Sequence, residues 1–108
     1  MSVKLDRIQD ASLRQSLSDA QDELRTGNYG GVVHRAADAY VELLRRKPEM
    51  LNGAMGMRHI MFFPRLGAHL IMEADGSPTV VYDREKFTFA EAVTYWEFAV
   101  DSLAREGL

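Results

Sequence analysis

Residues 5–48 read LDRIQDASLRQSLSDAQDELRTGNYGGVVHRAADAYVELLRRKP, two stretches of helical period that meet at a glycine. In the first stretch, apolar residues recur mostly at steps of three and four with charged residues between them, which predicts an amphipathic helix over about 5–25. The step from Ile8 to Leu13 is longer, and Ser12 with Gln15 has the spacing of a capping box. The sequence therefore leaves open a later start for this helix.

The corner after this helix has a clear chemical signature. Gly27 suits a left-handed helix cap, and the Asn28 side chain can cap the helix that follows. Residues 31–47 then carry a broad apolar stripe, with cations in the last turn and Pro48 as the stop. The stripe consists of Val33, Ala36, Ala37, Tyr40, Leu43 and Leu44. Together the two stretches predict a tight antiparallel helical hairpin.

Residues 49–85 have a different character. The segment 49–67 is rich in methionine and glycine without a clean period, and we expect a short helix over 57–63 that stops before Pro64. Two short aliphatic runs, 68–73 and 79–83, flank the turn sequence Asp-Gly-Ser-Pro. This pattern predicts a β-hairpin.

A last helix begins at Thr88, because Thr88 and Glu91 have capping-box spacing and Phe87 and Ala92 occupy the hydrophobic-staple positions. Its apolar face continues to Gly107. The fold class predicted for the chain is α+β and mostly α. We expect a single domain over residues 1–108, in which a bundle of three to four helices carries one β-hairpin inserted before the C-terminal helix.

Composition narrows the classes of function. The chain has no cysteine, which excludes a disulfide framework, a thiol nucleophile and a cysteine-based zinc site. The net charge of -3 is spread along the chain and makes nucleic acid an unfavoured partner. No uncharged apolar run approaches the ~18 residues of a spanning helix, and the charged N-terminal stretch is unlike a secretory signal. We expect a soluble cytoplasmic protein with no membrane partner and no cofactor.

The corner sequence LRTGNY at 24–29, followed by the alanine-rich helix through Ala36, Ala39 and Tyr40, resembles the tetratricopeptide repeat and the HEPN domain. The repeat resemblance covers one hairpin only, and a lone hairpin cannot form a solenoid. The HEPN resemblance covers both early helices and implies a small, often dimeric helical bundle related to toxin-like ribonucleases. That family's catalytic signature, an Arg followed by His after four to six residues, is absent around all three histidines.

Histidines and arginines supply the candidates for a ligand site. His34 and Asp38 are four residues apart and share a helix face, where such a pair could hold a metal or orient a general base. A surface pair explains the same spacing. Arg58, His59 and Arg65 flank an apolar segment and could bind an anion such as phosphate, or form salt bridges instead. With His69, the histidines could also converge on one metal ion.

Soft and aromatic side chains supply the candidates for an interface. Methionine is adaptable in cores and at interfaces, and a domain of this size buries a limited share of its surface. Two aromatic residues of the last helix also lie off its main stripe, as a second buried face would produce. The interface candidates are Met55, Met57, Met61, Phe62, Phe63, Phe89 and Tyr95.

These patterns favour a non-enzymatic protein-interaction module that forms a homodimer and recognises a protein partner through the Met-rich segment and the last helix. The alternative is a small metal-binding or ligand-binding protein, or an enzyme, that uses the histidines. No nucleophile stands out in the sequence, and no catalytic residue is assigned.

Overall fold

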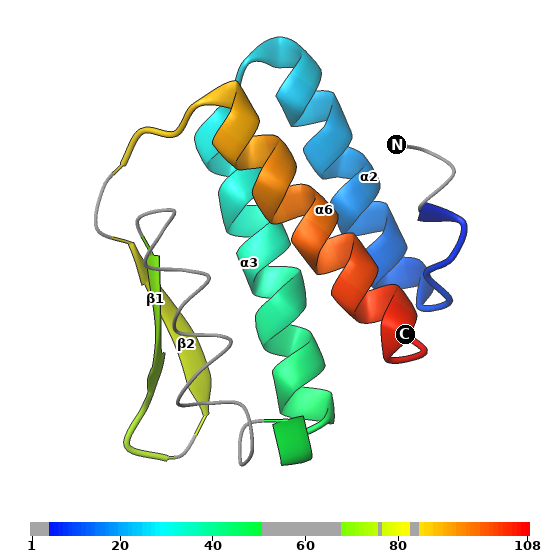
Figure 1. The fold of residues 1–108 in the computed structure, drawn as a ribbon, viewed down its shortest axis with the longest axis vertical. Helices are drawn as coiled ribbons and strands as arrows, with labels where there is room; N and C mark the ends of the chain where they lie inside the picture. The colour runs from blue at the N-terminus through cyan, green and yellow to red at the C-terminus, as the bar shows by residue number, and fades with distance from the viewer. Residues whose placement is uncertain (1–4, 51–67, 76, 83–84) are drawn as a thin grey trace. The chain divides into compact units, whose positions relative to one another are not determined.

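The computed structural model describes residues 5–50, 68–75, 77–82 and 85–108, and in these the chain is mostly helical (Figure 1). The three described helices are α2 (Ala11–Thr26), α3 (Tyr29–Arg46) and α6 (Phe89–Arg105), and the strands are β1 (Ala68–Met72) and β2 (Pro78–Tyr82). The chain divides into two compact units. Unit 1 comprises Met1–Tyr40 and Lys86–Leu108, and unit 2 comprises Val41–Glu85. The helix expected over 57–63 lies outside the described residues.

Helix α2 starts late, at Ala11, and its N-cap is Asp10. The Asp10 carboxylate accepts a hydrogen bond from the backbone N–H of Leu13 at 2.9 Å, so the late start that the sequence left open is the observed one, but Asp10 and not Ser12 is the cap. Asp10 fills this role because the chain before it is held in place: Ile8 is buried, and the Asp10 N–H donates to the carbonyl of Leu108. An aspartate cap also places a negative charge at the positive end of the helix dipole.

The corner between α2 and α3 is as predicted. Gly27 adopts the left-handed conformation at φ 86°, and its N–H returns to carbonyls of the last turn of α2. The Asn28 side-chain oxygen accepts from the N–H of Gly31 at 3.2 Å, which confirms the expected cap. Helix α3 begins at Tyr29, earlier than the expected Gly31, and all six residues of its predicted stripe are buried. Glycine is required at 27 because L residues rarely adopt this φ.

Helix α6 begins with the predicted capping box. The N–H of Glu91 donates to the Thr88 hydroxyl at 3.2 Å, and the N–H of Thr88 donates to the Glu91 carboxylate at 2.9 Å. Phe87, at the staple position, is buried and meets the ring of Tyr95 edge-on with centroids 6.1 Å apart. The helix ends at Arg105, just before Gly107 at φ 82°.

The core of unit 1 lies between α2, the first part of α3 and α6. Helix α6 runs antiparallel to α2 and in the same direction as α3 (Figure 1). The buried indole N–H of Trp96 donates to the backbone carbonyl of Leu17 at 2.9 Å, which joins α6 to α2. Tyr40 and Phe98 place their ring centroids 4.8 Å apart and join α6 to α3. Each pair of helices therefore has its own specific contact, since α2 and α3 share the corner.

In unit 2, β1 and β2 pair antiparallel in a two-stranded sheet, with His69 opposite Val81 and Ile71 opposite Thr79. The connecting turn carries a local side-chain bond. The Asp75 carboxylate accepts from both the N–H and the hydroxyl of Ser77, at 2.9 and 2.6 Å. These bonds favour the ionised carboxyl, so the pKa of Asp75 is lowered from its ordinary value.

Replacing Ser77 with alanine is expected to raise the pKa of Asp75 toward its ordinary value, because the hydroxyl bond is the largest cause of the shift. A lowered pKa in the folded state adds stability that is present above the unfolded-state pKa and is lost as the pH falls through the folded value. The midpoint of the Asp75 carboxyl ¹³C shift against pH measures this in both proteins. Identical midpoints would contradict the assignment of the turn.

Candidate functional site

The predicted ligand residues are only partly described. His34 and Asp38 are both exposed on α3, four residues apart as expected. Arg58, His59 and Arg65 lie outside the described residues, and His69 is placed only by its position in β1 opposite Val81. Among the residues that the structure describes, no group of three His, Asp or Glu side chains could hold a metal ion. A site that uses all three histidines stays a prediction.

The interface candidates divide in a similar way. The five members in the Met-rich segment, Met55, Met57, Met61, Phe62 and Phe63, lie outside the described residues. Tyr95 is 1% exposed, so the side chain is already buried within the chain and is not available as an interface residue. The buried arc of α6 is wider than its main stripe, because Tyr95 packs under the staple residue Phe87. Phe89 is 55% exposed and is available on the surface.

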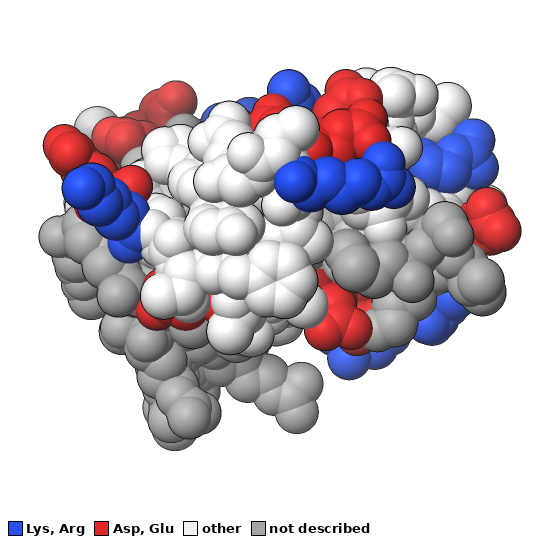
Figure 2. Space-filling view, turned by 90° about the horizontal axis from the view of Figure 1, so that it is seen from above, with Lys and Arg blue, Asp and Glu red and all other residues white. Residues whose placement is uncertain are grey.

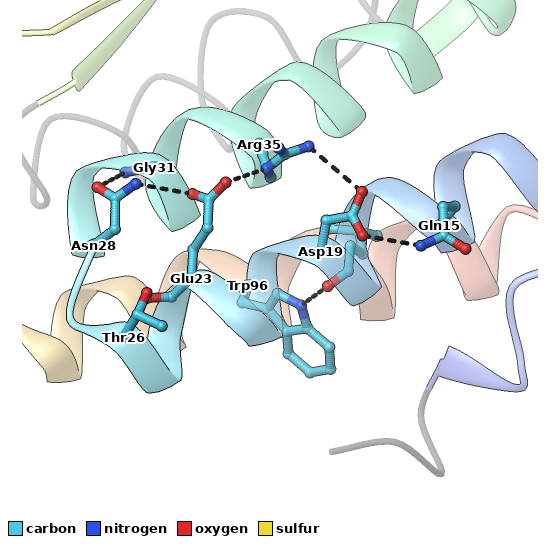
Figure 3. A network of polar contacts seen from close by, with 9 residues as sticks. Gln15, Asp19, Glu23, Thr26, Asn28, Gly31, Arg35 and Trp96 are labelled. Carbon is cyan, nitrogen blue, oxygen red and sulfur yellow. Dashed lines mark hydrogen bonds and ion pairs between the residues drawn. The ribbon is translucent and has the colours of Figure 1, made fainter.

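A polar network that the sequence analysis did not identify joins α2 to α3 (Figure 3). The guanidinium of Arg35 donates to the Glu23 carboxylate at 2.6 Å and lies 4.0 Å from that of Asp19. Gln15 donates to the other Asp19 oxygen at 2.9 Å. The hydrogen bond that Arg35 donates to Glu23, more than any other cause, raises the pKa of Arg35, which keeps its charge at all ordinary pH values.

A sequence signal for this network exists in the distance of each residue from the corner. Glu23 and Gly31 are equally far from Gly27, and so are Asp19 and Arg35. In an antiparallel helical hairpin, residues equidistant from the corner lie opposite each other. The pair of Asp19 and Arg35 could therefore have been predicted by aligning the two helices about Gly27. The polar groups of this network bond to one another, and together they connect α2 to α3.

Gly31 is the position that lets the Glu23 carboxylate approach α3. A Cβ atom placed on Gly31 would overlap the Glu23 carboxylate and would also crowd the Asn28 amide. That amide donates to the same carboxylate at 3.4 Å. The absence of a side chain at 31 thus makes room for the Glu23 bonds to both Asn28 and Arg35.

The Gly31→Ala substitution is expected to displace the Glu23 carboxylate from Arg35, while alanine itself favours the helix by up to about 1 kcal/mol. A double-mutant cycle tests this. Glu23→Ala should cost about 0.5–1 kcal/mol of unfolding free energy in the original chain and close to nothing in the Gly31→Ala background, as measured by urea denaturation. An equal cost in both backgrounds would show that Glu23 does not depend on the space at Gly31.

The strongest candidate for a binding surface is the end of unit 1 where α3 and α6 begin. Tyr29 and Phe89, the first residues of these helices, meet edge-on with ring centroids 5.9 Å apart and define what we call the aromatic end. Neighbouring positions, including Asn28, Gly30 and Thr88, are uncharged. Figure 2 looks onto this end and shows an area without lysine, arginine, aspartate or glutamate, bordered by charged groups.

Comparisons with protein-family models, with characterised proteins and with solved structures gave no match for this chain. Within the described residues, no helix combines the length and apolar character needed to cross a membrane.

Proposed function

We propose that this chain is a non-enzymatic protein-interaction module that forms a homodimer and binds a protein partner through the aromatic end. The proposal includes a fold in which a helical bundle carries a β-hairpin before α6. It also includes a cytoplasmic location. The HEPN resemblance, which implies a dimeric bundle, agrees with the proposed homodimer. The Met-rich segment is the second candidate contact surface.

The exposure of Phe89 is the observation that supports the proposal most directly. Phe89 is 55% exposed, although a phenylalanine ring offers about 200 Å² of apolar surface that favours burial. Tyr29 contacts the ring edge-on and limits its motion before any partner arrives. Aromatic anchors that are rigid before binding dominate the energetics of many interfaces, because little conformational entropy is lost when they are covered.

The described polar side chains near this surface fit a binding role better than a chemical one. Glu23 and Arg35 are bonded to each other, and Glu91 is engaged in the cap of α6. Carboxylates that are held in salt bridges and helix caps stabilise helices and do not supply an acid-base pair. The aromatic end would therefore contribute apolar contact area and backbone groups to a complex.

Sedimentation equilibrium tests the dimer, and site-specific photo-crosslinking in the protein's own cells tests the partner surface. We expect a dimer at micromolar concentrations and a crosslinked adduct with benzoyl-phenylalanine at position 89. Position 105 is the matched control, because Arg105 is also exposed on α6 but lies at its other end.

Phe89→Ser should weaken the complex about tenfold or more, since about half a ring of contact area is lost. A monomer with equal crosslinking at 89 and 105 would refute the proposal.

A further inference from the structure

Asp75 lies in the turn between β1 and β2, and the residue that follows it in the sequence is Gly76. In an Asp–Gly dipeptide, the backbone nitrogen of the glycine can attack the side-chain carboxyl carbon of the aspartate and close a five-membered succinimide ring. Glycine favours this attack because it has no side chain to shield the nitrogen. The Asp75 side chain is also exposed, so water and protons reach its carboxyl group.

Two hydrogen bonds oppose this reaction at Asp75. Its carboxylate oxygen Oδ1 accepts from the N–H of Ser77 at 2.9 Å and from the Ser77 hydroxyl at 2.6 Å. Ring closure requires the aspartate side chain to eclipse its own backbone carbonyl carbon, which is far from the staggered rotamers that side chains normally occupy. Because both donors hold the carboxylate in place, they oppose the rotation that ring closure needs.

The same two bonds act on the charge of the carboxyl group. The ring closes from the neutral carboxylic acid, whose hydroxyl leaves as water, whereas an ionised carboxylate has no such leaving group. The Ser77 hydroxyl bond and then the Ser77 N–H bond lower the pKa of Asp75, and the positive charge of Arg45 in α3 acts in the same direction. The reactive neutral form is therefore scarcer at neutral pH than in an Asp–Gly dipeptide without these partners.

We propose that Asp75 is a site of spontaneous isomerisation to isoaspartate and that Ser77 sets the rate. In the first step the Gly76 nitrogen bonds to Cγ of Asp75, and the amide proton and the carboxyl hydroxyl leave together as water. Water then adds to one of the two ring carbonyls. Opening at the backbone carbonyl of Asp75 leaves the chain linked through the side chain, with one extra CH₂ in the backbone and a free α-carboxylate. Water is the only co-reactant.

The product would change the turn in a defined way. In the unmodified turn, the N–H of Glu73 donates to the carbonyl of Ser77 at 2.8 Å, one step beyond the paired strands. Isomerisation lengthens the backbone between these two residues and moves the negative charge of Asp75 from its side chain to the backbone. Ser77 then loses its side-chain acceptor, and we expect weaker pairing at this end of the sheet.

Incubation of the purified chain at neutral pH tests the proposal. Electron-transfer fragmentation of the tryptic peptide 66–84 distinguishes isoaspartate from aspartate at position 75, and successive samples give the rate. Ser77→Ala should raise this rate about twofold or more. The increase should be no smaller than the factor by which the ¹³C titration shows the acid dissociation constant of Asp75 to fall. Ser77→Thr retains both donors and should keep the original rate.

Asp38 is the internal control, because it is also exposed and precedes the small residue Ala39, but both lie within α3. The helix fixes the backbone there and bonds its N–H groups, so we expect no isoaspartate at position 38. The chemical shifts of the hairpin report whether each variant keeps the turn. Absence of isoaspartate at position 75 from every variant, or equal rates in the original chain and in Ser77→Ala, would overturn the proposal.

Discussion

Replacing Trp96 with phenylalanine is expected to lower the free energy of unfolding by about 2–4 kcal/mol. Trp96 is fully buried, and its indole N–H donates to the Leu17 carbonyl, so the substitution removes both packing volume and the bond that joins α6 to α2. Urea denaturation followed by circular dichroism measures the loss. The near-ultraviolet signal of Trp96 in the original chain should disappear in the same transition as the helical signal.

Two controls separate the parts of this effect. Phe89→Leu changes an exposed aromatic residue of the same helix and should alter the unfolding free energy by less than about 0.5 kcal/mol. A benzothienyl-alanine at position 96 keeps the bicyclic shape without the N–H and should cost about 1 kcal/mol. If Trp96→Phe cost no more than Phe89→Leu, the indole would not be the centre of the unit 1 core.

Ile8→Ala is expected to cost about 2–4 kcal/mol of unfolding free energy, although Ile8 precedes the first residue of α2. The side chain of Ile8 is fully buried, and its carbonyl accepts from the Arg14 guanidinium at 3.1 Å. The segment before α2 therefore belongs to the core of unit 1. Differential scanning calorimetry provides the measurement.

The control for Ile8→Ala is its exposed neighbour Gln9, where alanine should change stability by less than about 0.5 kcal/mol. Equal stability of the two variants would mean that the segment before α2 adds little to the core. A lower unfolding temperature for Ile8→Ala alone would support the structure, in which this segment packs on unit 1.

Local chemistry made several features of the fold predictable from the sequence. The caps at Gly27, Asn28 and Thr88 depend on residues at most four positions away, and the structure confirms all three. The cap of α2 was not predictable in this way, because Ser12 offers the same local chemistry as Asp10. The choice depends on where the preceding chain is anchored, and that anchor includes the distant residue Leu108.

The candidate surface was predictable only in part, for a similar reason. Phe89 and Tyr95 look alike in a helical period, yet one is exposed and the other is covered by Phe87. The width of the buried arc on α6 depends on what packs against it, and a single-helix pattern carries no such information. The ion pairs of Arg35 could be predicted only after the two helices had been aligned about their corner.

The order of segments in unit 1 has a consequence for how this protein can vary. Unit 2, Val41–Glu85, lies in the sequence between the two parts of unit 1, so unit 1 is complete only once Lys86–Leu108 has been added. The entropy of closing such a loop rises slowly, by about 0.6 kcal/mol for each doubling of its length. The inserted part beyond the end of α3 can therefore lengthen, shorten or change its contact residues in evolution while unit 1 keeps most of its stability.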